Sequence, residues 1–442
     1  MSEQLPKPGN YTLQQLFLIS SDGKRAADIT GVLVSVNFLE SMDIKGSRGS
    51  INLVDTVGNL IEDLGILGDE IVFMEWETPA YKPGKKTVRQ FTGRVTGIKN
   101  IGYSDNNQGT TLTLSFIDDL AYDQAFNNIN LAYKDTLSNI AEKIFMKAKT
   151  QPMKDKLAIP KLYADFKKDD TDGIVDLIIP NETPFDSMEY LLGQCFSATN
   201  KSCKWYFYQN KDGYNFRSLE DIIKESKDEM KDKKKKEAFT YKLDYAQMKE
   251  TTDNREVAYN IQSIHQFNRV PGFSTYEKGG LKQAVNEVDY IFKRVERTEK
   301  QFDINDYTLF DTNLSVSEQL MDTYGKESNS TEYIYSDGTR NNQSDLSQSI
   351  INKKFMTQYL YSNMVQINIA GNSDITPGIL LNLLVQDPAK FGEPGSPVPL
   401  EPSLSGLFLI KDVNHTFTKQ AYVQNVTLTR MGENAEWSNW IR

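Results

Sequence analysis

The chain has 442 residues, of which 39% are hydrophobic and 11% aromatic, so it can form about three domains with apolar cores. Its formal net charge of -10 disfavours general nucleic-acid binding, which needs a basic surface. Its two cysteines, Cys195 and Cys203, exclude a disulfide framework and suit a reducing compartment. The first ten residues lack the features of a signal peptide, and no apolar run approaches the roughly 18 residues of a membrane span. We therefore expect a soluble protein assembled in a cytoplasm.

The N-terminal region predicts antiparallel strands. Five segments have strand-like composition and are separated by short polar or glycine-containing turns: 31–39, 49–55, 70–76, 88–98 and 110–118. The first is expected to place alternate residues on one face: Val32, Val34, Val36 and Phe38. The last is expected to do the same with Leu112, Leu114 and Phe116. Period-two alternation of this kind predicts an antiparallel barrel or sandwich.

After residue 120, the apolar residues recur at helical spacing and no longer alternate with polar ones. The segment 135–148 predicts a helix that Asp135 could cap, with a buried stripe of Leu137, Ile140, Ala141, Ile144, Phe145 and Ala148. A second helix is expected from Thr183 as the cap, with Pro184 at its first position and Asp186 in its first turn. Its buried stripe would comprise Phe185, Met188, Leu191, Leu192, Cys195 and Phe196. A hairpin that turns at Asp212-Gly213 follows.

A charged segment then separates two parts of the chain. Between Lys224 and Glu237, seven lysines are nearly balanced by five acids, which favours a solvated connector or exposed helix over a contact surface. From about residue 250 strand-like segments return. The polar stretch 324–345 is expected to be mobile or ordered by a partner, and 344–364 predicts a helix capped by Ser344 or Asp345.

Two regions of the chain have the same order of parts. Gly68-Asp69 precedes the apolar segment 70–77, a loop rich in proline and glycine, and two strands joined by a polar turn. Pro377-Gly378 precedes 379–386, a similar loop, and the strands 407–417 and 422–431. We interpret this as an internal duplication, although antiparallel barrels in general share such an order. The glycine turns are expected to be structural, and Pro377-Gly378 to start a strand buried on both faces.

The predicted division of the chain is a first β-barrel (1–120), an α+β insertion (121–225), a charged connector (226–250) and a second β-barrel (251–442). The fold class is therefore β-rich α+β, with two tandem antiparallel β-barrel domains and an α+β insertion between them.

Few residues are candidates for chemistry. His265 and His415 are far apart in sequence and have no nearby cysteine, so a zinc site lacks ligands. His415 lies on a predicted strand and is better explained by packing or a turn hydrogen bond. The stretch "PGKKT" at 83–87 lacks the first glycine of a phosphate loop. Neither a G-x-S-x-G nor an H-E-x-x-H motif occurs.

Paired carboxylates are the hardest class of active site to exclude, because they follow no spacing rule. Glu182 with Asp186 is one such pair, but helix capping explains both residues. Cys195 is expected to be a buried structural thiol. We therefore predict no catalytic, cofactor-binding or metal-binding residue. Trp437 and Trp440 near the C-terminal end are candidates for a partner interface, unless they fold back onto their own barrel.

The order of four stretches resembles a known family. They are "GDEIVFMEWE" with "FTGRVTGI", "NETPFDSMEYLLGQC" with "KWYFYQNKDGYNF", "NSDITPGILLNLL", and "LFLIKDVNHTFTKQAYVQNVTLTRM". In this order the chain resembles the central baseplate hub protein of contractile-tailed phages, and the hub half of the VgrG spike of type VI secretion. None of the four is a fingerprint by itself.

The resemblance implies a structural role without catalysis. Two tail-tube-like barrels per chain would make a homotrimer into a pseudo-sixfold ring that joins a sixfold tail tube to a threefold central spike. Implied partners are the tail-tube or tube-initiator proteins and the tape-measure protein, with DNA only in transit through the channel. The implied location is the baseplate of the virion tail, after assembly in the host cytoplasm.

The chain departs from VgrG because no OB-type domain or needle repeat follows its last predicted strand. We therefore expect the spike to be a separate protein, to which Trp437 and Trp440 could bind. Two alternatives stay open at the level of sequence: a receptor- or glycan-binding tail protein, and a peptidoglycan hydrolase at the tail tip.

Overall fold

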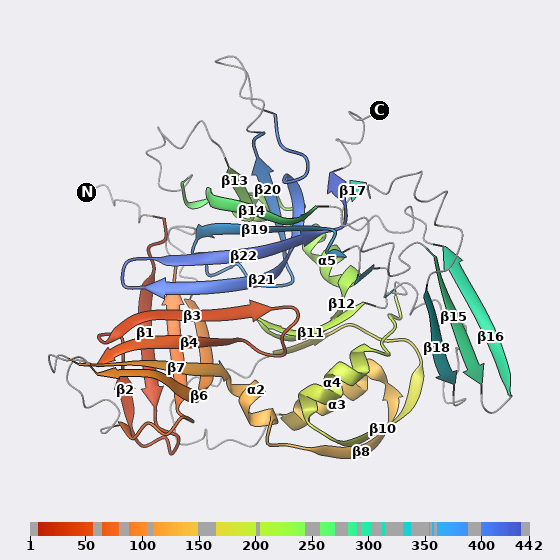
Figure 1. The fold of residues 1–442 in the computed structure, drawn as a ribbon, viewed down its shortest axis with the longest axis horizontal. Coiled ribbons are helices and arrows are strands. Elements are labelled where there is room, and N and C mark those ends of the chain that lie inside the picture. Colours follow the sequence, from red (N-terminus) through yellow and green to blue (C-terminus); the bar gives the residue numbers. More distant parts are fainter. Residues whose placement is uncertain are drawn as a thin grey trace.

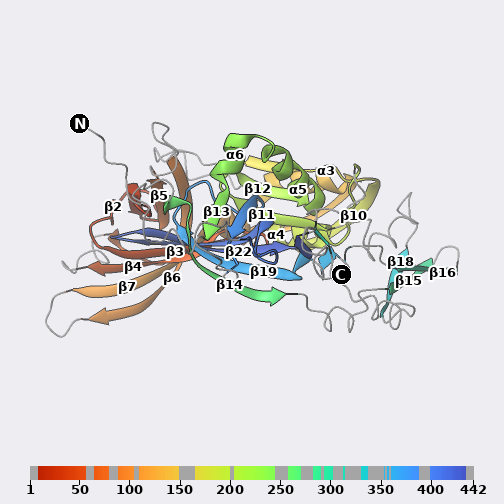
Figure 2. The same ribbon diagram turned by 90° about the horizontal axis from the view of Figure 1, so that it is seen from above.

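The computed structural model describes residues 8–55, 64–78, 88–103, 109–148, 165–199, 204–243, 257–269, 282–289, 293–301, 312–313, 330–336, 353, 356–357, 360–387 and 399–434. It is β-rich, and its main sheet runs through both the N-terminal and the C-terminal parts of the chain (Figure 1). Figure 2 shows that the helices gather toward one side of this sheet. Among the described helices, none has the length and hydropathy that crossing a membrane requires.

The first half of the sheet contains the five predicted strands. Its described strands are β1 (Thr12–Ile19), β2 (Ala26–Asp28), β3 (Leu33–Ser41), β4 (Arg48–Asp55), β5 (Ile71–Glu77), β6 (Val88–Tyr103) and β7 (Thr110–Asp118). The hydrogen-bonded order is β3-β4-β7-β6-β5-β1-β2, and neighbours are antiparallel. Sequence analysis missed β1 and β2. The predicted inward face of β7 is confirmed, because Leu112, Leu114 and Phe116 are buried.

The predicted face of β3 is only half correct. Val36 and Phe38 are buried, but Val34 is exposed and Leu33 is buried in its place. The register against β4 shifts between Leu33 and Ser35, which leaves Val34 as the extra residue of a β-bulge. A bulge reverses the alternation on one side of itself, so a strict period of two fails there.

The α+β part lies beside the sheet. Its described elements are α2 (Asp119–Gln124), β8 (Ile129–Thr136), α3 (Leu137–Ala148), β9 (Asp165–Lys168), β10 (Ile174–Glu182), α4 (Pro184–Leu192), β11 (Trp205–Asn210), β12 (Gly213–Ser218), α5 (Leu219–Glu229) and α6 (Lys233–Ala238). β8 pairs with β10, and β12 pairs with both β11 and β9. The predicted stripe of α3 is buried throughout and packs with α4 in one core.

The predicted start of α4 is confirmed. Thr183 accepts a hydrogen bond from the amide of Asp186, and Pro184 occupies the first turn. The predicted cap of α3 is wrong, because α3 begins at Leu137 and Asp135 lies one residue before the cap position. The hydroxyl of Thr136 accepts from the Asn139 amide instead (3.4 Å), one residue later in the chain.

Three further details of this part depart from expectation. Cys195 is buried, as expected of a structural thiol, but it lies beyond the end of α4 at Leu192. Phe196 is only half-buried. The hairpin loop comprises Lys211 and Asp212, since Asn210 pairs with Gly213, so the turn comes one residue earlier than predicted.

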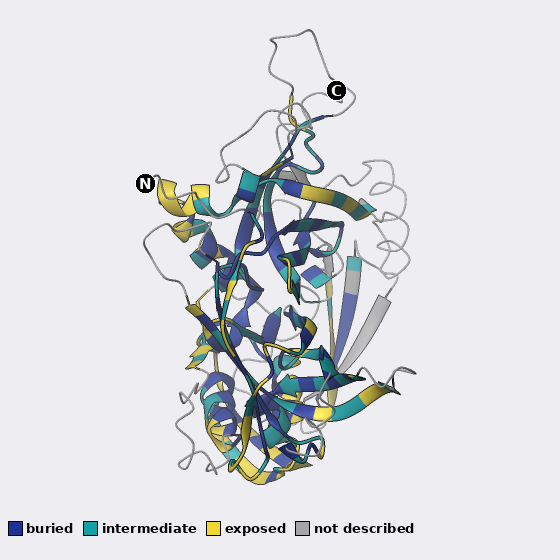
Figure 3. Ribbon diagram, turned by 90° about the vertical axis from the view of Figure 1, so that its left-hand side faces the viewer, coloured by how far each residue is buried: buried dark blue, intermediate teal, exposed yellow. Residues whose placement is uncertain are grey.

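Most of the charged segment is helical and exposed, although Ser226 and Met230 are buried. α5 buries its apolar stripe, whereas α6 has no buried residue. This matches the exposed-helix interpretation. Figure 3 shows exposed residues (yellow) on helical turns at the surface and buried residues (dark blue) on the strands inside. The boundaries predicted for the domains stay a prediction.

The second half of the sheet is built from β13 (Thr240–Leu243), β14 (Ile261–Arg269), β19 (Asn363–Ala370), β20 (Leu380–Val385), β21 (Gly406–Thr418) and β22 (Tyr422–Arg430). Its order is β14-β19-β22-β21-β20-β13, and the last pair is parallel. An isolated bridge joins Lys242 to Asn260, so β13 comes back beside the start of β14.

A smaller sheet stands apart from the main one (Figure 1). It consists of β15 (Lys282–Asp289), β16 (Arg294–Gln301) and β18 (Ser330–Ser336), and β17 (Thr312–Asn313) pairs separately with β23 (Glu433–Asn434). β18 lies within the polar stretch 324–345, and whether that stretch is mobile or ordered by a partner stays a prediction. Of the helix predicted at 344–364, the described residues Lys353, Met356, Thr357 and Leu360 are helical, whereas Asn363 already begins β19. The proposed caps Ser344 and Asp345 lie outside the described residues.

One long strand joins the two halves. The first part of β21 pairs with β20, and its second part pairs with β3, from Asp412 opposite Ser41 to Thr418 opposite Ser35. The main sheet is therefore continuous in the order β14-β19-β22-β21-β3-β4-β7-β6 before it reaches β5. Figure 1 shows this join where the blue strands lie against the red ones.

The two halves repeat the same strand order. β3-β4-β7-β6-β5 in the first half corresponds to β14-β19-β22-β21-β20 in the second. In each half, the register of the long strand against its neighbour leaves out one residue at the equivalent position. This residue is Thr96 where β6 pairs with β7, and Lys411 where β21 pairs with β22. The skipped residues Val34 in β3 and Gln262 in β14 also correspond.

A trio of side chains is repeated as well. Asn52 donates to Ser35 (2.9 Å) and accepts from Thr113 (2.8 Å) across three neighbouring strands. The equivalent trio in the second half is Ser263, Asn368 and Asn425, with both hydrogen bonds 2.7 Å long. Shared bulges and a shared trio are more than antiparallel strands in general require, and they support the duplication.

The predicted glycine turns both need glycine. Gly68 has φ +101° and Gly378 has φ +83°, a region that side chains strongly disfavour. Pro377 precedes Gly378, as in a type II turn. β20 is buried on both faces only at its start, since Leu380 and Leu381 are buried but Asn382 and Leu384 are half-buried.

Candidate functional site

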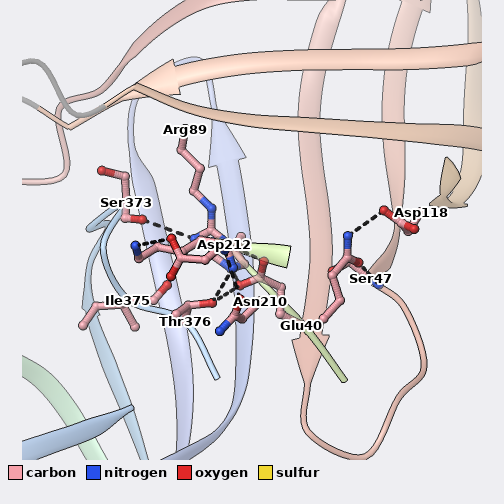
Figure 4. Close-up of polar contacts among 12 residues, drawn as sticks. Glu40, Ser47, Arg89, Asp118, Asn210, Asp212, Ser373, Ile375 and Thr376 are labelled. Atoms are coloured by element: carbon pink, nitrogen blue, oxygen red, sulfur yellow. Dashed lines mark hydrogen bonds and ion pairs between the residues drawn. The ribbon is translucent and has the colours of Figure 1, made fainter. Parts of the chain in front are cut away.

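A buried polar cluster lies where the two halves meet. It contains Glu40 of β3, Arg89 of β6, His415 of β21, and the turn that leads to Gly378. Because β3 and β21 pair directly, Glu40 and His415 are neighbours in space despite a separation of 375 residues in sequence. Figure 4 shows part of this cluster.

Glu40 and Arg89 form a buried ion pair. Arg89 also donates from Nη1 to the backbone carbonyls of Ser373 (3.3 Å) and Ile375 (3.1 Å) in the turn of the second half. Burial raises the pKa of Glu40, but the charge of Arg89 and the hydrogen bond from His415 outweigh it and bring the pKa to about 2. The carboxylate of Glu40 is therefore ionised at neutral pH. Arg89 connects the first half of the sheet to the second, because it binds groups in both.

His415 is fully buried, with its ring stacked on Phe38 (4.2 Å between centroids). Its Nε2 lies 3.1 Å from Glu40 Oε2, and its Nδ1 lies 2.8 Å from the Tyr422 hydroxyl. Burial lowers the pKa of His415 by more than Glu40 raises it, so the ring is neutral. We assign the proton to Nε2, which donates to Glu40, while Nδ1 accepts from Tyr422.

The network continues into the second half. Gln424 donates from Nε2 to the Tyr422 hydroxyl (2.8 Å) and to the Asn372 carbonyl (3.0 Å), and its Oε1 accepts from the Asn372 amide (2.9 Å). Asn372 then donates to the Tyr241 hydroxyl (3.1 Å) on β13. A connected set of this kind specifies one relative position of the strands, since a shift would leave buried polar groups without partners.

The tip of the β11–β12 hairpin reaches both halves (Figure 4). The Lys211 amide donates to the hydroxyl of Thr376 (3.1 Å), which itself donates to Glu40 (3.4 Å). Gln209 accepts from the Ser47 amide (2.8 Å) and donates to Asp118 (2.6 Å) in the first half. The hairpin therefore fixes the α+β part against both halves at once.

Gly378 adds a steric contact to this junction. A Cβ atom at this position would lie 2.0 Å from the hydroxyl oxygen of Tyr208 on β11, so the turn packs directly against the hairpin. No such contact exists at Gly68, where a Cβ would meet nothing within 4 Å.

The cluster is suited to holding segments together rather than to catalysis. Glu40, Arg89 and His415 are buried, and their polar atoms contact one another, the hydroxyls of Thr376 and Tyr422, and backbone carbonyls. Within the described ranges, no group of three or more His, Cys, Asp or Glu side chains could hold a metal ion.

The other candidate residues do not come together. His265 is exposed on β14 and lies edge-on to Phe267 (4.6 Å between centroids). Asp186 is held by Lys45 (2.8 Å) and Thr183 (2.7 Å), and the hydrogen bond from Lys45 lowers its pKa. Capping and an ion pair thus account for Asp186. Four predicted features lie outside the described residues: Trp437, Trp440, Cys203 and the "PGKKT" stretch.

Sequence analysis did not identify Glu40 or Arg89. One signal was available, because Glu40 continues the inward alternation of Val36 and Phe38, and Arg89 alternates with the buried Phe91. A charged residue at an inward strand position needs a buried partner. The identity of that partner could not be predicted, because the partners come from strands that are distant in the sequence.

Comparisons with known proteins agree at the level of fold. No family model and no curated protein matches the chain. Among solved structures it is similar to a tail protein from Neisseria meningitidis MC58, with TM-score 0.52 and 12% identity over 95% of this chain and 96% of the other.

It is also similar to the 43 kDa tail protein of prophage MuSo2 from Shewanella oneidensis, with TM-score 0.53 and 10% identity over 94% and 98% of the two chains. The chain shares its fold with phage tail proteins. The similarity covers nearly the whole length of this chain and of both similar chains, so it is not confined to one half of the sheet.

Proposed function

We propose that the chain is a structural baseplate hub of a phage-type tail. Three copies would form a pseudo-sixfold ring that joins the sixfold tail tube to the threefold central spike. The observation that carries this proposal is the repeat of one strand order in two halves joined edge to edge by β21 and β3. A chain with two equivalent units is what a trimer needs to present six equivalent positions.

In this proposal each half is a tail-tube-like β-barrel. For the second half, the bridge between Lys242 and Asn260 supports closure, because it brings the last strand of the order beside the first. The buried cluster around Glu40, Arg89 and His415 then has a mechanical role. It holds the two barrels of one chain at a fixed angle, and a fixed angle is required for a ring that closes.

The proposed partners follow from that place in the tail. They are a second and third copy of the chain, a separate spike protein, the tail-tube or tube-initiator proteins, and the tape-measure protein. The net charge of -10 suits a channel through which DNA passes without being bound. The proposed location is the virion tail baseplate, after assembly in the host cytoplasm, and the proposed role includes no enzymatic step.

The native mass of the purified chain, alone and together with the spike protein of the same tail, tests the proposal. A species near three times 50.3 kDa is expected. A chain that stays monomeric with the spike present would overturn the hub. Binding to cells by the isolated chain, or peptidoglycan hydrolysis lost on replacing one carboxylate, would replace it with one of the two alternatives. The Trp437→Ala variant should weaken spike binding, and unchanged binding would remove the tryptophan contact alone.

A further inference from the structure

The helix α5 holds the α+β part against the second half of the main sheet. It contacts β12 of the α+β part and β20 of the second half, and Figure 1 shows it where these parts meet. The hydroxyl of its buried Ser226 accepts a hydrogen bond from the Leu380 amide at the start of β20 (2.8 Å). Undocking of α5 would therefore break a contact between two parts of the chain.

The apolar side of α5 is buried in a cluster that contains residues of both halves and of the β11–β12 hairpin. Its buried members are Met42, Tyr206, Tyr208, Leu219, Ile222, Ile223, Met230, Met356, Leu360, Leu380, Leu409 and Met431. Four of these twelve are methionines, whose unbranched side chains adapt to changes of shape. The cluster can therefore tolerate a shift of α5 better than a core of branched side chains could.

One carboxyl group beside this cluster has no partner for one of its oxygens. Glu220 lies in the first turn of α5, and its Oε2 atom is inaccessible to water and receives no hydrogen bond from a described group. An ionised carboxylate in such a place would lose its hydration without replacement. The docked helix therefore favours the protonated, neutral form, and burial raises the pKa of Glu220 to about 8.

The groups around Glu220 supply no opposite charge. Tyr206 of β11 lies within electrostatic range of it. The other titratable groups on the surrounding elements are Asp43, Lys204, Tyr361, Lys411 and Asp412. Lys411 is held by Asp43 (2.8 Å). The one neighbouring charge that acts on the pKa of Glu220 is the like charge of Asp221, which raises it.

We propose that α5 is a pH-sensitive latch, a helix that stays docked on the cluster while Glu220 holds its proton and undocks more readily when that proton is lost. The latch is independent of the proposed function. In an undocked helix water surrounds the carboxyl group, so the pKa of Glu220 returns to an ordinary 4.5. Between pH 4.5 and about 8 the docked state therefore binds more protons than the undocked state, and a rise in pH favours undocking.

Hydrogen exchange of the full chain tests the latch. Exchange of the amides in peptides from Leu219–Glu229 is measured by mass spectrometry between pH 6 and pH 8 and corrected for the intrinsic exchange rate at each pH, which gives the opening constant of α5. We expect the opening constant of the wild type to rise about tenfold per pH unit, because one carboxyl group titrates between the two states. In Glu220→Gln, which cannot ionise, the opening constant should not change with pH.

A matched variant separates the buried carboxyl group from the charge of the helix. Glu229→Gln removes one negative charge from the exposed end of α5, where Glu229 pairs with Lys235 (3.4 Å). This variant should keep the pH dependence of the wild type. Loss of the pH dependence in Glu229→Gln as well would show that the net charge of the helix is responsible, and would overturn the latch.

The remaining outcomes also decide the inference. An opening constant of the wild type that does not change with pH would overturn it, as would the same pH dependence in Glu220→Gln. The buried strand β22, Tyr422–Arg430, reports the unfolding of the main sheet. If α5 and β22 open with the same constant at every pH, Glu220 acts on the whole fold and there is no latch. None of these results bears on the oligomeric state, so failure of the latch leaves the hub intact.

Chemical denaturation tests the protonation of Glu220 by a second route. The unfolded wild type loses its proton near pH 4.5 and the folded wild type near pH 8, so its folding equilibrium should weaken about tenfold per pH unit between these values, relative to Glu220→Gln. A ratio of the two equilibria that stays constant from pH 5 to pH 8 would contradict a neutral Glu220 in the docked helix.

Discussion

Substituting alanine for the two turn glycines separates backbone strain from packing. Gly68→Ala introduces a side chain at φ +101° into open space, so it should cost about 1–2 kcal/mol of unfolding free energy from backbone strain alone. Gly378→Ala has a similar strain at φ +83°, and its Cβ would also lie 2.0 Å from the Tyr208 hydroxyl oxygen. Overpacking adds about 1–3 kcal/mol, so the total should be about 2–5 kcal/mol.

Chemical denaturation of the two variants measures the difference. Adding Tyr208→Phe to Gly378→Ala should recover part of the cost, because it removes the hydroxyl but leaves the ring carbon Cζ 2.8 Å from the new Cβ. The same substitution should not rescue Gly68→Ala, which does not touch the hairpin. Equal costs at the two glycines, or no coupling between Gly378 and Tyr208, would refute the claim that this turn is packed against the α+β part.

Three further predictions concern the charged groups of the junction. The pKa of His415 in the folded state lies below 6.5, so the unfolded state binds the proton first and stability is lost as pH falls below 6.5. The stability advantage of wild type over His415→Gln should therefore shrink between pH 7.5 and 5.5. A difference that stays constant over this range would count against a buried neutral ring. The pKa of Glu40 is about 2 in the folded state against an ordinary 4.5. Its contribution to the free energy of unfolding is therefore present above pH 4.5 and lost between pH 4.5 and 2. Acid titration of wild type and Glu40→Gln would detect this loss. Arg89→Met alone should cost about 3–5 kcal/mol of unfolding free energy, because it leaves the buried Glu40 carboxylate without its cation. Adding Glu40→Gln should recover part of that cost in a double-mutant cycle, and simple additivity would be the contrary result.

Local sequence patterns determined most of the elements. β7 has the bounds and the buried face that its alternation predicts, and α4 begins at the cap and proline that its sequence specifies. These features depend on residues a few positions apart, whose periodicity and capping chemistry act in any fold. The two glycines were identified for the same reason, because a turn with positive φ requires glycine wherever it occurs.

Which strands meet depended on the tertiary structure. The extra residue at Val34 could not be anticipated, since a bulge exists only relative to the strand it pairs with. The buried polar cluster could not be predicted for the same reason. Glu40 and His415 become neighbours only when β21 pairs with β3, and these strands are separated by most of the length of the chain. The sequence by itself determined two similar sets of strands around an α+β segment. Only the folded chain decided that they share one sheet, because edge pairing between distant strands leaves no local pattern in either strand.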